Sequence, residues 1–443
     1  MLVINNFLKF IEKFFFKFLI LVFSFLGFFI LYKSEIQFHG YERIYFSKYL
    51  LILLLFIFIS YFIDKFIYNK KIKQNIILFV CSSFFSLYFL EFLLISKENY
   101  EKKKYLKILK PGWSINKYLK ENSLNLPAIA PYDLSDINNN KSKFFIFSNI
   151  SKKKLLLCEE ANGLISFDTD RYGFNNHDIL WDKKKIFIFL GDSFTQGFCV
   201  NSNKNFISLF DYKNKINLGQ QGTGPLVQYA ILREYIKKID SKFVLWFFYE
   251  GNDFRDLEVE KNNNFLFNYL VNKEFNQNLI NKQNLVNDVN YKKINEINKK
   301  TSFSNSDNDF INNFKFKSFI RLTFLRSYLK DLISENEIYQ NLILDTKKLL
   351  ESNNSNLIII YIPSFERYLN NNNFLLNLKY KNLLKFYKKN NIKYYDLKKD
   401  IFDKEDDVFK FFPNGNKGHF NEKGHQIIAD YLNKNLLINL KNN

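Results

Sequence analysis

The sequence predicts an α/β domain with a five-stranded parallel sheet, preceded by transmembrane helices. Two observations predict this organisation. Three long apolar segments lie within residues 1–97, and five short apolar runs follow later in the chain. Helix-sized connections separate these runs, which favours βαβ units with helices on both faces of the sheet, a three-layer α/β/α arrangement.

The apolar N-terminal segments, residues 14–32, 49–63 and 76–95, are each expected to cross a membrane. The first and third have about the 20 residues that span a hydrocarbon core, and the second can lengthen through snorkelling of its charged neighbours. A buried helical hairpin in a soluble core is the alternative, but three such runs in succession are unusual there. No small-residue cleavage site follows the first segment. We therefore expect a multi-pass membrane protein with the lipid bilayer as a partner.

The formal net charge of +20 would suggest nucleic acid or an anionic surface as a partner. The lysines, however, are spread along the chain, and no basic stripe is interleaved with base-stacking aromatic residues. We therefore expect a solvated surface rich in lysine and no nucleic-acid partner.

The sequence gives weaker evidence for the side of the membrane on which the large domain lies than for the membrane spans themselves. A literal positive-inside count puts it in the cytoplasm, but long domains translocate largely regardless of charge, and lysine is abundant everywhere in this chain. We expect an extracytoplasmic domain. Cys158 and Cys199 are the two cysteines of the soluble part: an exported domain could pair them, whereas a cytoplasmic one would keep them as thiols.

After the membrane domain, residues 98–184 are expected to form a juxtamembrane linker region, because Pro111, Pro127 and Pro131 break it into short pieces. The sheet domain is expected over residues 185–443. Its strands are predicted at residues 185–190, 215–218, 243–248, 357–362 and 392–397. Each run has strand length, and an all-helical fold would need longer ones.

The connection between the third and fourth predicted strands is too long for one crossover, so residues 254–355 or thereabouts are interpreted as an insertion. Its middle, residues 287–309, is polar and low in complexity, which predicts a mobile segment between helices. This segment is either a lid over the site or a solvated excursion without a role.

The stretch IFIFLGDSFTQG, which contains the first predicted strand, puts Ser193 where a nucleophile would act. Ligands bind beyond the carboxyl ends of the strands in a doubly wound sheet. Gly191 lets the backbone turn sharply there, and the following helix offers free N–H groups and its positive dipole end. An α/β-hydrolase elbow would read Gly-x-Ser-x-Gly, whereas Thr195 stands at the second glycine position.

The next two predicted strands end in residues that can donate hydrogen bonds. Gly222, in NLGQQGTGP, could bring a backbone N–H close to a substrate, and Asn252, in YEGNDF, brings a side-chain amide. With the N–H of Ser193, these groups make three donors that could surround an oxyanion, each contributing about 3 to 4 kcal/mol. A polar turn is the simpler interpretation of each one taken singly.

A histidine follows the fifth predicted strand, in NKGHFNEKGH, and could take the proton from Ser193. We choose His419 as this base. His425 lies inside the start of the last predicted helix and is interpreted as a packing or capping residue.

These four pieces, in this order, resemble the SGNH/GDSL hydrolase family, and the resemblance extends upstream through DRYGFNN to membrane-anchored bacterial members. It covers about residues 185–437 and implies a flavodoxin-like three-layer fold. It also implies that Ser193 is the nucleophile and His419 the base, and that the N–H groups of Ser193 and Gly222 and Nδ2 of Asn252 form the oxyanion hole.

One position departs from the family pattern. The last family block reads Asp-x-x-His, but Asn416 stands three residues before His419. An aspartate would hold the imidazole in the correct tautomer and stabilise its cation, and an Asp-to-Asn change in a serine protease costs about 10⁴ in rate. An asparagine oxygen can still accept the Nδ1 proton, so we expect a slower Ser-His-Asn enzyme or a domain whose chemistry has decayed.

The sequence thus predicts a membrane-anchored serine esterase that cleaves or transfers a small acyl ester, with a cell-surface polysaccharide as the expected carrier. The alternative is a catalytically impaired module that binds a glycan or a partner protein. We expect no cofactor and no metal, because the four histidines show no ligand spacing with cysteines or paired carboxylates. The residues leave the oligomeric state and the acyl group open.

Overall fold

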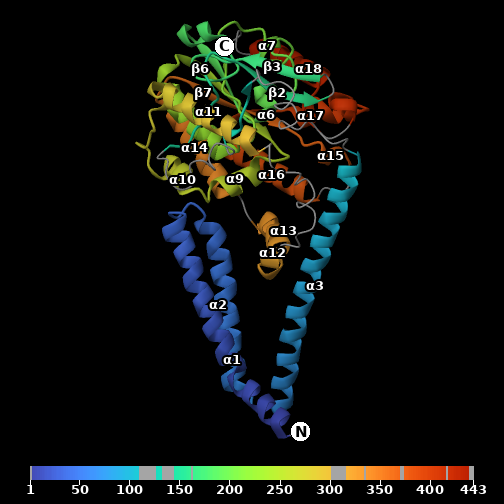
Figure 1. Ribbon diagram of the computed structural model, residues 1–443. Helices are drawn as coiled ribbons and strands as arrows, with labels where there is room; N and C mark the ends of the chain where they lie inside the picture. Colours follow the sequence, from blue (N-terminus) through green and yellow to red (C-terminus); the bar gives the residue numbers. More distant parts are fainter. Residues whose placement is uncertain are drawn as a thin grey trace. The chain divides into compact units, whose positions relative to one another are not determined.

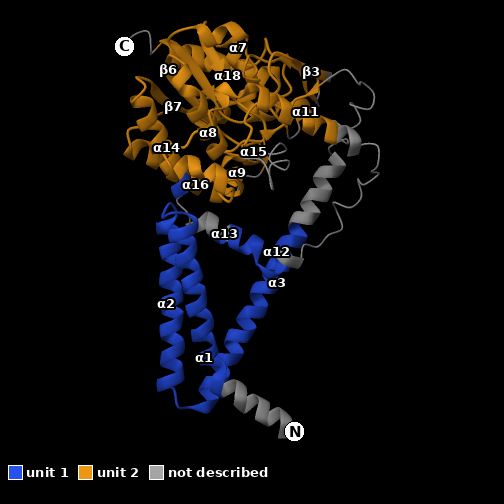
Figure 2. Cartoon of the chain, turned by 60° about the vertical axis from the view of Figure 1, so that its left-hand side comes forward, with its two compact units in different colours: residues 1–110, 307–338 blue, residues 111–306, 339–443 orange. Residues whose placement is uncertain are grey.

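The computed structural model describes residues 2–108, 126–131, 144–160, 163–300, 316–333, 336–369, 374–415 and 418–438. The chain divides into two compact units (Figure 2). Unit 1 comprises residues 1–110 and 307–338, and unit 2 comprises residues 111–306 and 339–443.

Unit 1 is built from three long helices and a short helical pair. The long helices are α1 (Leu2–Leu31), α2 (Arg43–Phe66) and α3 (Lys70–Ile108), and the pair is α12 (Phe316–Ile320) and α13 (Thr323–Ile333). A π-helical turn, Tyr32–Gln37, extends α1.

The three long helices carry segments that are long and apolar enough to cross a membrane, Lys13–Gln37, Arg43–Phe66 and Lys70–Lys97. Their large apolar side chains point outward along most of their length. Phe25 is 72% exposed and Phe85 is 80% exposed. A surface of this kind suits acyl chains and not water. The three predicted apolar helices are confirmed.

Unit 2 contains the predicted five-stranded parallel sheet, which is confirmed (Figure 1). Its strands are β4 (Ile186–Leu190), β5 (Lys215–Asn217), β6 (Ser241–Tyr249), β7 (Asn356–Ile362) and β8 (Lys393–Asp396). They lie in the order β5-β4-β6-β7-β8, and every neighbouring pair is parallel. The order reverses at β4, so the chain leaves the neighbouring strands β4 and β6 toward opposite sides, the arrangement at which open α/β sheets usually bind ligands.

Apolar side chains bury both faces of this sheet, which explains why its strands read as continuous apolar runs. On one face, alternate residues such as Phe189 and Phe247 belong to a core shared with α7 (Phe206–Leu209) and α18 (Glu422–Leu432). On the other face, Nε1 of Trp246 donates to Gln228 of α8 over 2.6 Å.

The helices of unit 2 occupy the long connections. They are α6 (Ser193–Gln196), α7, α8 (Pro225–Tyr235), α9 (Asp253–Glu260), α10 (Asn264–Val271), α11 (Gln283–Lys300), α14 (Glu337–Glu351, with its first two residues in unit 1), α15 (Glu366–Leu369), α16 (Phe374–Lys389), α17 (Leu397–Asp400) and α18. Much of the stretch expected to be a low-complexity loop is therefore helical, because α11 covers residues 287–300.

A second, three-stranded sheet lies in the stretch expected to be a linker. It consists of β1 (Leu126–Pro127), β2 (Lys154–Glu160) and β3 (Gly163–Asp168). β2 and β3 are antiparallel, and β1 pairs with β2 in parallel. Its apolar residues, including Leu157 and Phe167, form a small core together with Cys199. This second sheet therefore packs beside the turn that follows α6.

Candidate active site

The turn after β4 holds Ser193 at the carboxyl end of the sheet. All five residues of β4 are buried. A Cβ at Gly191 would lie 2.2 Å from Oγ1 of Thr195, so only glycine fits between the strand and the next helix. Asp192 caps α6 by accepting the N–H of Phe194 over 2.9 Å. Ser193 is therefore the first residue of a short, tightly held helix.

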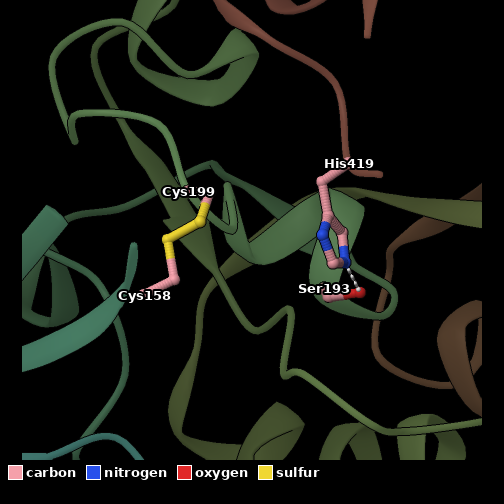
Figure 3. Close-up of a disulfide and its surroundings, with 4 residues drawn as sticks. All are labelled: Cys158, Ser193, Cys199 and His419. Atoms are coloured by element: carbon pink, nitrogen blue, oxygen red, sulfur yellow. Dashed lines mark hydrogen bonds between the residues drawn. A yellow bond between two sulfur atoms is a disulfide. The ribbon is translucent and has the colours of Figure 1, made fainter. Parts of the chain in front are cut away.

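The structure brings His419 against Ser193. Nε2 of His419 lies 2.9 Å from Oγ of Ser193, although 226 residues separate them in the sequence (Figure 3). With Nε2 unprotonated, this imidazole accepts the hydroxyl proton, which is the geometry required of a general base. Both predicted residues thus share one hydrogen bond, while their catalytic roles stay a prediction.

Aromatic rings hold the imidazole from two directions. The ring centroid of His419 lies 5.0 Å from that of Phe194 and 4.4 Å from that of Phe198. Phe420, the next residue, is 1% exposed and also packs against Phe194. The side chain of Asn421 then caps α18 by accepting the N–H of Gly424. The two residues that follow His419 are thus anchored, and Phe194 and Phe198 hold its ring.

The two other predicted donors lie on the loops after β5 and β6. Gly222 has a φ of +66°, a left-handed conformation that favours glycine. Its loop contacts α6 directly, because the backbone N–H of Gln221 donates to Oε1 of Gln196 over 3.0 Å. Asn252 lies just before α9, and its Nδ2 donates to Oδ2 of Asp192 over 3.2 Å. The same side chain also hydrogen-bonds to the carboxylate of Asp256, so two acidic residues hold the Asn252 amide in place.

Asn416, together with Lys417, lies outside the described residues. Asp253, Glu422 and Asp406 are the acidic residues that were candidates to replace the family aspartate. Asp253 is fully buried and accepts the N–H of Tyr249, Glu422 forms an ion pair with Lys204, and Asp406 is exposed.

Asp192 is the acidic residue that sequence reasoning missed. Its carboxylate is 1% exposed, and burial raises its pKa to about 6, while the positive charge of the nearby His419 opposes the rise. Asp192 therefore interacts electrostatically with the imidazole of His419. Its position, directly after a buried strand and before the serine, is the signal in the sequence that could have indicated a role for Asp192.

His425, the second histidine of the same motif, lies in the core. It is 1% exposed, and its Nδ1 accepts the backbone N–H of Phe206 over 3.1 Å. Burial, together with the nearby charge of His419, lowers the pKa of His425 to about 3. His425 therefore stays neutral and structural.

A disulfide joins Cys158 of β2 to Cys199, and the Cα atoms are 5.5 Å apart (Figure 3). Cys199 directly follows Phe198, the ring that contacts His419. The bond therefore ties the smaller sheet to the segment that supports the base. Among the described residues, no group of three or more His, Cys, Asp or Glu side chains is arranged to hold a metal ion.

Comparisons with known proteins identify no family model that matches the chain. No curated protein matches it. Among solved structures, the chain is similar to a protein from Desulfitobacterium hafniense DCB-2 that is assigned to the lipolytic G-D-S-L family. The identity is 12% and the TM-score is 0.34, and the match covers 57% of this chain and 99% of that one.

Proposed function

We propose that the chain is a membrane-anchored serine esterase of the SGNH/GDSL type, which cleaves or transfers a small acyl ester. The observation that carries the proposal is the 2.9 Å separation between Oγ of Ser193 and Nε2 of His419 at the carboxyl end of a parallel sheet. The sheet order supports the flavodoxin-like three-layer fold of that family.

In the proposed reaction, Oγ of Ser193 attacks the ester carbonyl while Nε2 of His419 takes the hydroxyl proton. The carbonyl oxygen becomes an oxyanion, which the N–H groups of Ser193 and Gly222 and Nδ2 of Asn252 stabilise. His419 then gives its proton to the leaving alcohol, and an acyl-serine remains. Water as the second acceptor completes hydrolysis, whereas a sugar hydroxyl completes transfer.

The proposed organisation follows the expected divisions: a membrane domain over residues 1–97, a juxtamembrane region over residues 98–184 and the esterase domain over residues 185–443. The Cys158–Cys199 disulfide supports an extracytoplasmic esterase domain, because such bonds persist in oxidising compartments and are rare in the cytosol. An enzyme anchored there would meet cell-surface carbohydrate, which we propose as the carrier of the acyl group.

The second candidate is a module that binds a glycan or a partner protein through the same site. The residue that favours it is Asn416, which brings no negative charge to the imidazole. The two candidates differ in whether Ser193 is nucleophilic.

A fluorophosphonate probe separates the two candidates, because it labels a serine only when an adjacent base activates it. We expect the full chain in detergent to be labelled at Ser193, and the Ser193→Ala variant to remain unlabelled. Ser352→Ala, which removes an exposed serine far along the chain, serves as the matched control and should label like the wild type.

An unlabelled wild-type chain would count against the esterase. The Asn416→Asp variant then decides what remains. Turnover of a simple acetate ester by this variant alone would identify a decayed enzyme, whereas no turnover by either form would favour the binding module.

A further inference from the structure

The helical pair α12–α13 comes from the insertion between β6 and β7, yet it packs within unit 1 against the third apolar helix. Figure 2 shows the pair beside α3, in the colour of the three long helices. The contact is specific. The hydroxyl of Tyr88 donates to the carbonyl of Ile320 over 3.1 Å, and its ring lies 5.3 Å from that of Phe319.

A buried carboxylate fixes the start of α13. Glu91 of α3 is fully buried, and its two oxygens accept the N–H groups of Phe324 and Leu325 over 2.9 and 2.8 Å. These are free donors of the first helical turn, and the positive end of the helix dipole favours the negative charge. A carboxylate inside an apolar span is costly unless it is satisfied in this way.

A second carboxylate makes the converse contact at the C-terminal end of residues 307–338, the part of the insertion that belongs to unit 1. Oε1 and Oε2 of Glu337 accept the N–H groups of Ile44 and Tyr45, in the first turn of α2, over 3.1 and 3.3 Å. Glu337 thus caps an apolar span, while Glu91 of another span caps α13. The segment is held to unit 1 at both of its ends.

The depth of Glu91 matches a membrane surface. The third apolar segment has 28 residues and so extends for about 42 Å, against a hydrocarbon core of about 30 Å. Glu91 precedes the last residue of that segment, Lys97, by about 9 Å along the helix. When the segment is centred in the bilayer, Glu91 therefore lies near the boundary between acyl chains and headgroups.

The pattern of α13 suits that boundary. In its sequence, TFLRSYLKDLI, apolar residues recur in pairs at helical spacing, and polar residues, two of them basic and one acidic, lie between the pairs. Leu325 packs inward and is 8% exposed, whereas Leu329 is 40% exposed and Ile320 of α12 is 51% exposed. Arg321 and Arg326 are exposed. An apolar face beside a basic face is typical of helices that lie in the plane of a bilayer surface.

We propose that α12 and α13 form a lipid-binding surface. The pair lies in the bilayer interface beside α3, with Leu329 toward the acyl chains and Arg326 toward the headgroups. The inference rests on the proposed membrane anchoring but not on the esterase chemistry. The insertion between β6 and β7 would then add a membrane contact to those of the three long helices.

Nitroxide labels on single cysteines test this surface in the full chain, reconstituted in nanodiscs of phosphatidylcholine and phosphatidylglycerol. Cys81 is the free thiol and is first replaced by serine, while Cys158 and Cys199 are protected in their disulfide. Labels are then placed at Leu329→Cys and, as the matched control on the polar side of α13, at Ser327→Cys. Oxygen, which concentrates among acyl chains, and a water-soluble nickel chelate report where each label lies.

We expect the label at residue 329 to favour oxygen and the label at residue 327 to favour the nickel chelate. A label at Phe58→Cys, which is 64% exposed on α2, calibrates the bilayer interior. If residue 58 favours oxygen while residues 329 and 327 both favour nickel, the surface faces water and the inference is overturned. If residue 58 also favours nickel, the membrane anchoring fails and the inference fails with it. Fluorophosphonate labelling of Ser193 is independent of either result.

The Glu91→Leu variant tests whether the capping contact holds α13 in place. We expect the oxygen preference at residue 329 to fall toward the value at residue 327, because the first turn of α13 loses its carboxylate acceptor. Glu91→Gln keeps one oxygen acceptor and should retain part of the preference. An unchanged preference in Glu91→Leu would contradict the docking of α13 through Glu91.

Discussion

His419 and His425 lie six residues apart in one motif, yet they occupy opposite environments. His419 belongs to the loop before α18, and its Nε2 meets the hydroxyl of Ser193. His425 lies in the first turns of α18, where its ring stacks on Phe206 and its Nδ1 accepts a backbone N–H. The same side chain therefore serves as a candidate base in the loop and as a structural acceptor in the helix.

The two histidines differ in whether their surroundings can stabilise a positive charge on the ring. The charge of His419 lowers the pKa of the Asp192 carboxyl, so the two groups interact electrostatically, and the hydroxyl of Ser193 lies 2.9 Å from Nε2 of His419. His425 is surrounded by apolar rings, and burial disfavours its cation. A histidine becomes useful as a base only where the cation is tolerated, so the loop and not the helix carries the proposed chemistry.

The largest expected effect comes from removing the loop histidine. His419→Ala should lower kcat/KM for a simple acetate ester by about 10⁴-fold or more, because Ser193 then has no base. The melting temperature should change less than the activity, since the ring is half-buried and lies outside the main core. Steady-state kinetics and a thermal scan in detergent check both parts. A comparable loss in His425→Asn, with unchanged folding, would erase the distinction between the two histidines.

The disulfide that supports the loop region should have the next largest effect. Opening the bond between Cys158 and Cys199 releases a loop of 41 residues in the unfolded chain, which lowers the free energy of unfolding by about 4 kcal/mol. The double variant with serine at both positions should therefore melt earlier than the wild type. Treatment of the wild type with a reducing agent should reproduce the shift, and the double variant should not respond to it.

Cys81→Ser is the control for this comparison, because it removes the free thiol without touching the disulfide. If the reducing agent shifts the melting temperature of the double variant as much as that of the wild type, the stabilisation does not arise from this bond.

His425 should make the stability of the folded protein depend on pH. Its pKa is about 3 when folded and about 6.5 in an unfolded chain, so the unfolded state binds the proton more readily. The stabilisation is fully present above pH 6.5 and is lost as the pH falls toward 3. Between pH 7 and pH 5 this histidine should lower the free energy of unfolding by about 2 kcal/mol.

The His425→Asn variant isolates this contribution, because the amide oxygen can still accept the N–H of Phe206 but does not titrate in this range. Denaturant unfolding in detergent at several pH values provides the measurement. An equally steep decline in wild type and variant would assign the pH dependence to other groups.

The sequence predicts the elements of this protein better than their contacts. The five strands of the large sheet are recognisable because both faces are buried, so strands such as β4 and β7 read as unbroken apolar runs. The small sheet was missed. β2 and β3 follow a region rich in lysine and asparagine, and nothing local predicts that they pair.

In the candidate site, too, the positions of residues could be predicted better than the contacts between them. Residues at strand ends, such as Ser193 and Asn252, could be predicted, because the carboxyl edge of a parallel sheet collects such positions. The contact of Asn252 with Asp192 could not, because it depends on how two loops pack. The cap that Glu91 gives to α13 joins residues more than two hundred positions apart, and no spacing rule predicts it.

The smallest expected change in activity comes from Asp192, whose carboxylate should stabilise the imidazolium that forms on His419. Asp192→Asn keeps an oxygen acceptor for the N–H of Phe194 but removes the charge, and we expect kcat to fall by about tenfold, the equivalent of ~1.4 kcal/mol. The pKa of Asp192 is about 6, so its ionised form is lost as the pH drops below that value.

Protonation of Asp192 removes the same charge as Asp192→Asn, so the wild type should be about tenfold faster than the variant above pH 7, and this ratio should fall toward 1 below pH 5. A purely structural role of Asp192 would lower the rate of the variant by the same factor at every pH. A ratio that does not change with pH would remove Asp192 from the proton balance of the site. The compensating charge at His419 would then have to come from another group, and the contrast with His425 would rest on the contact with Ser193 alone.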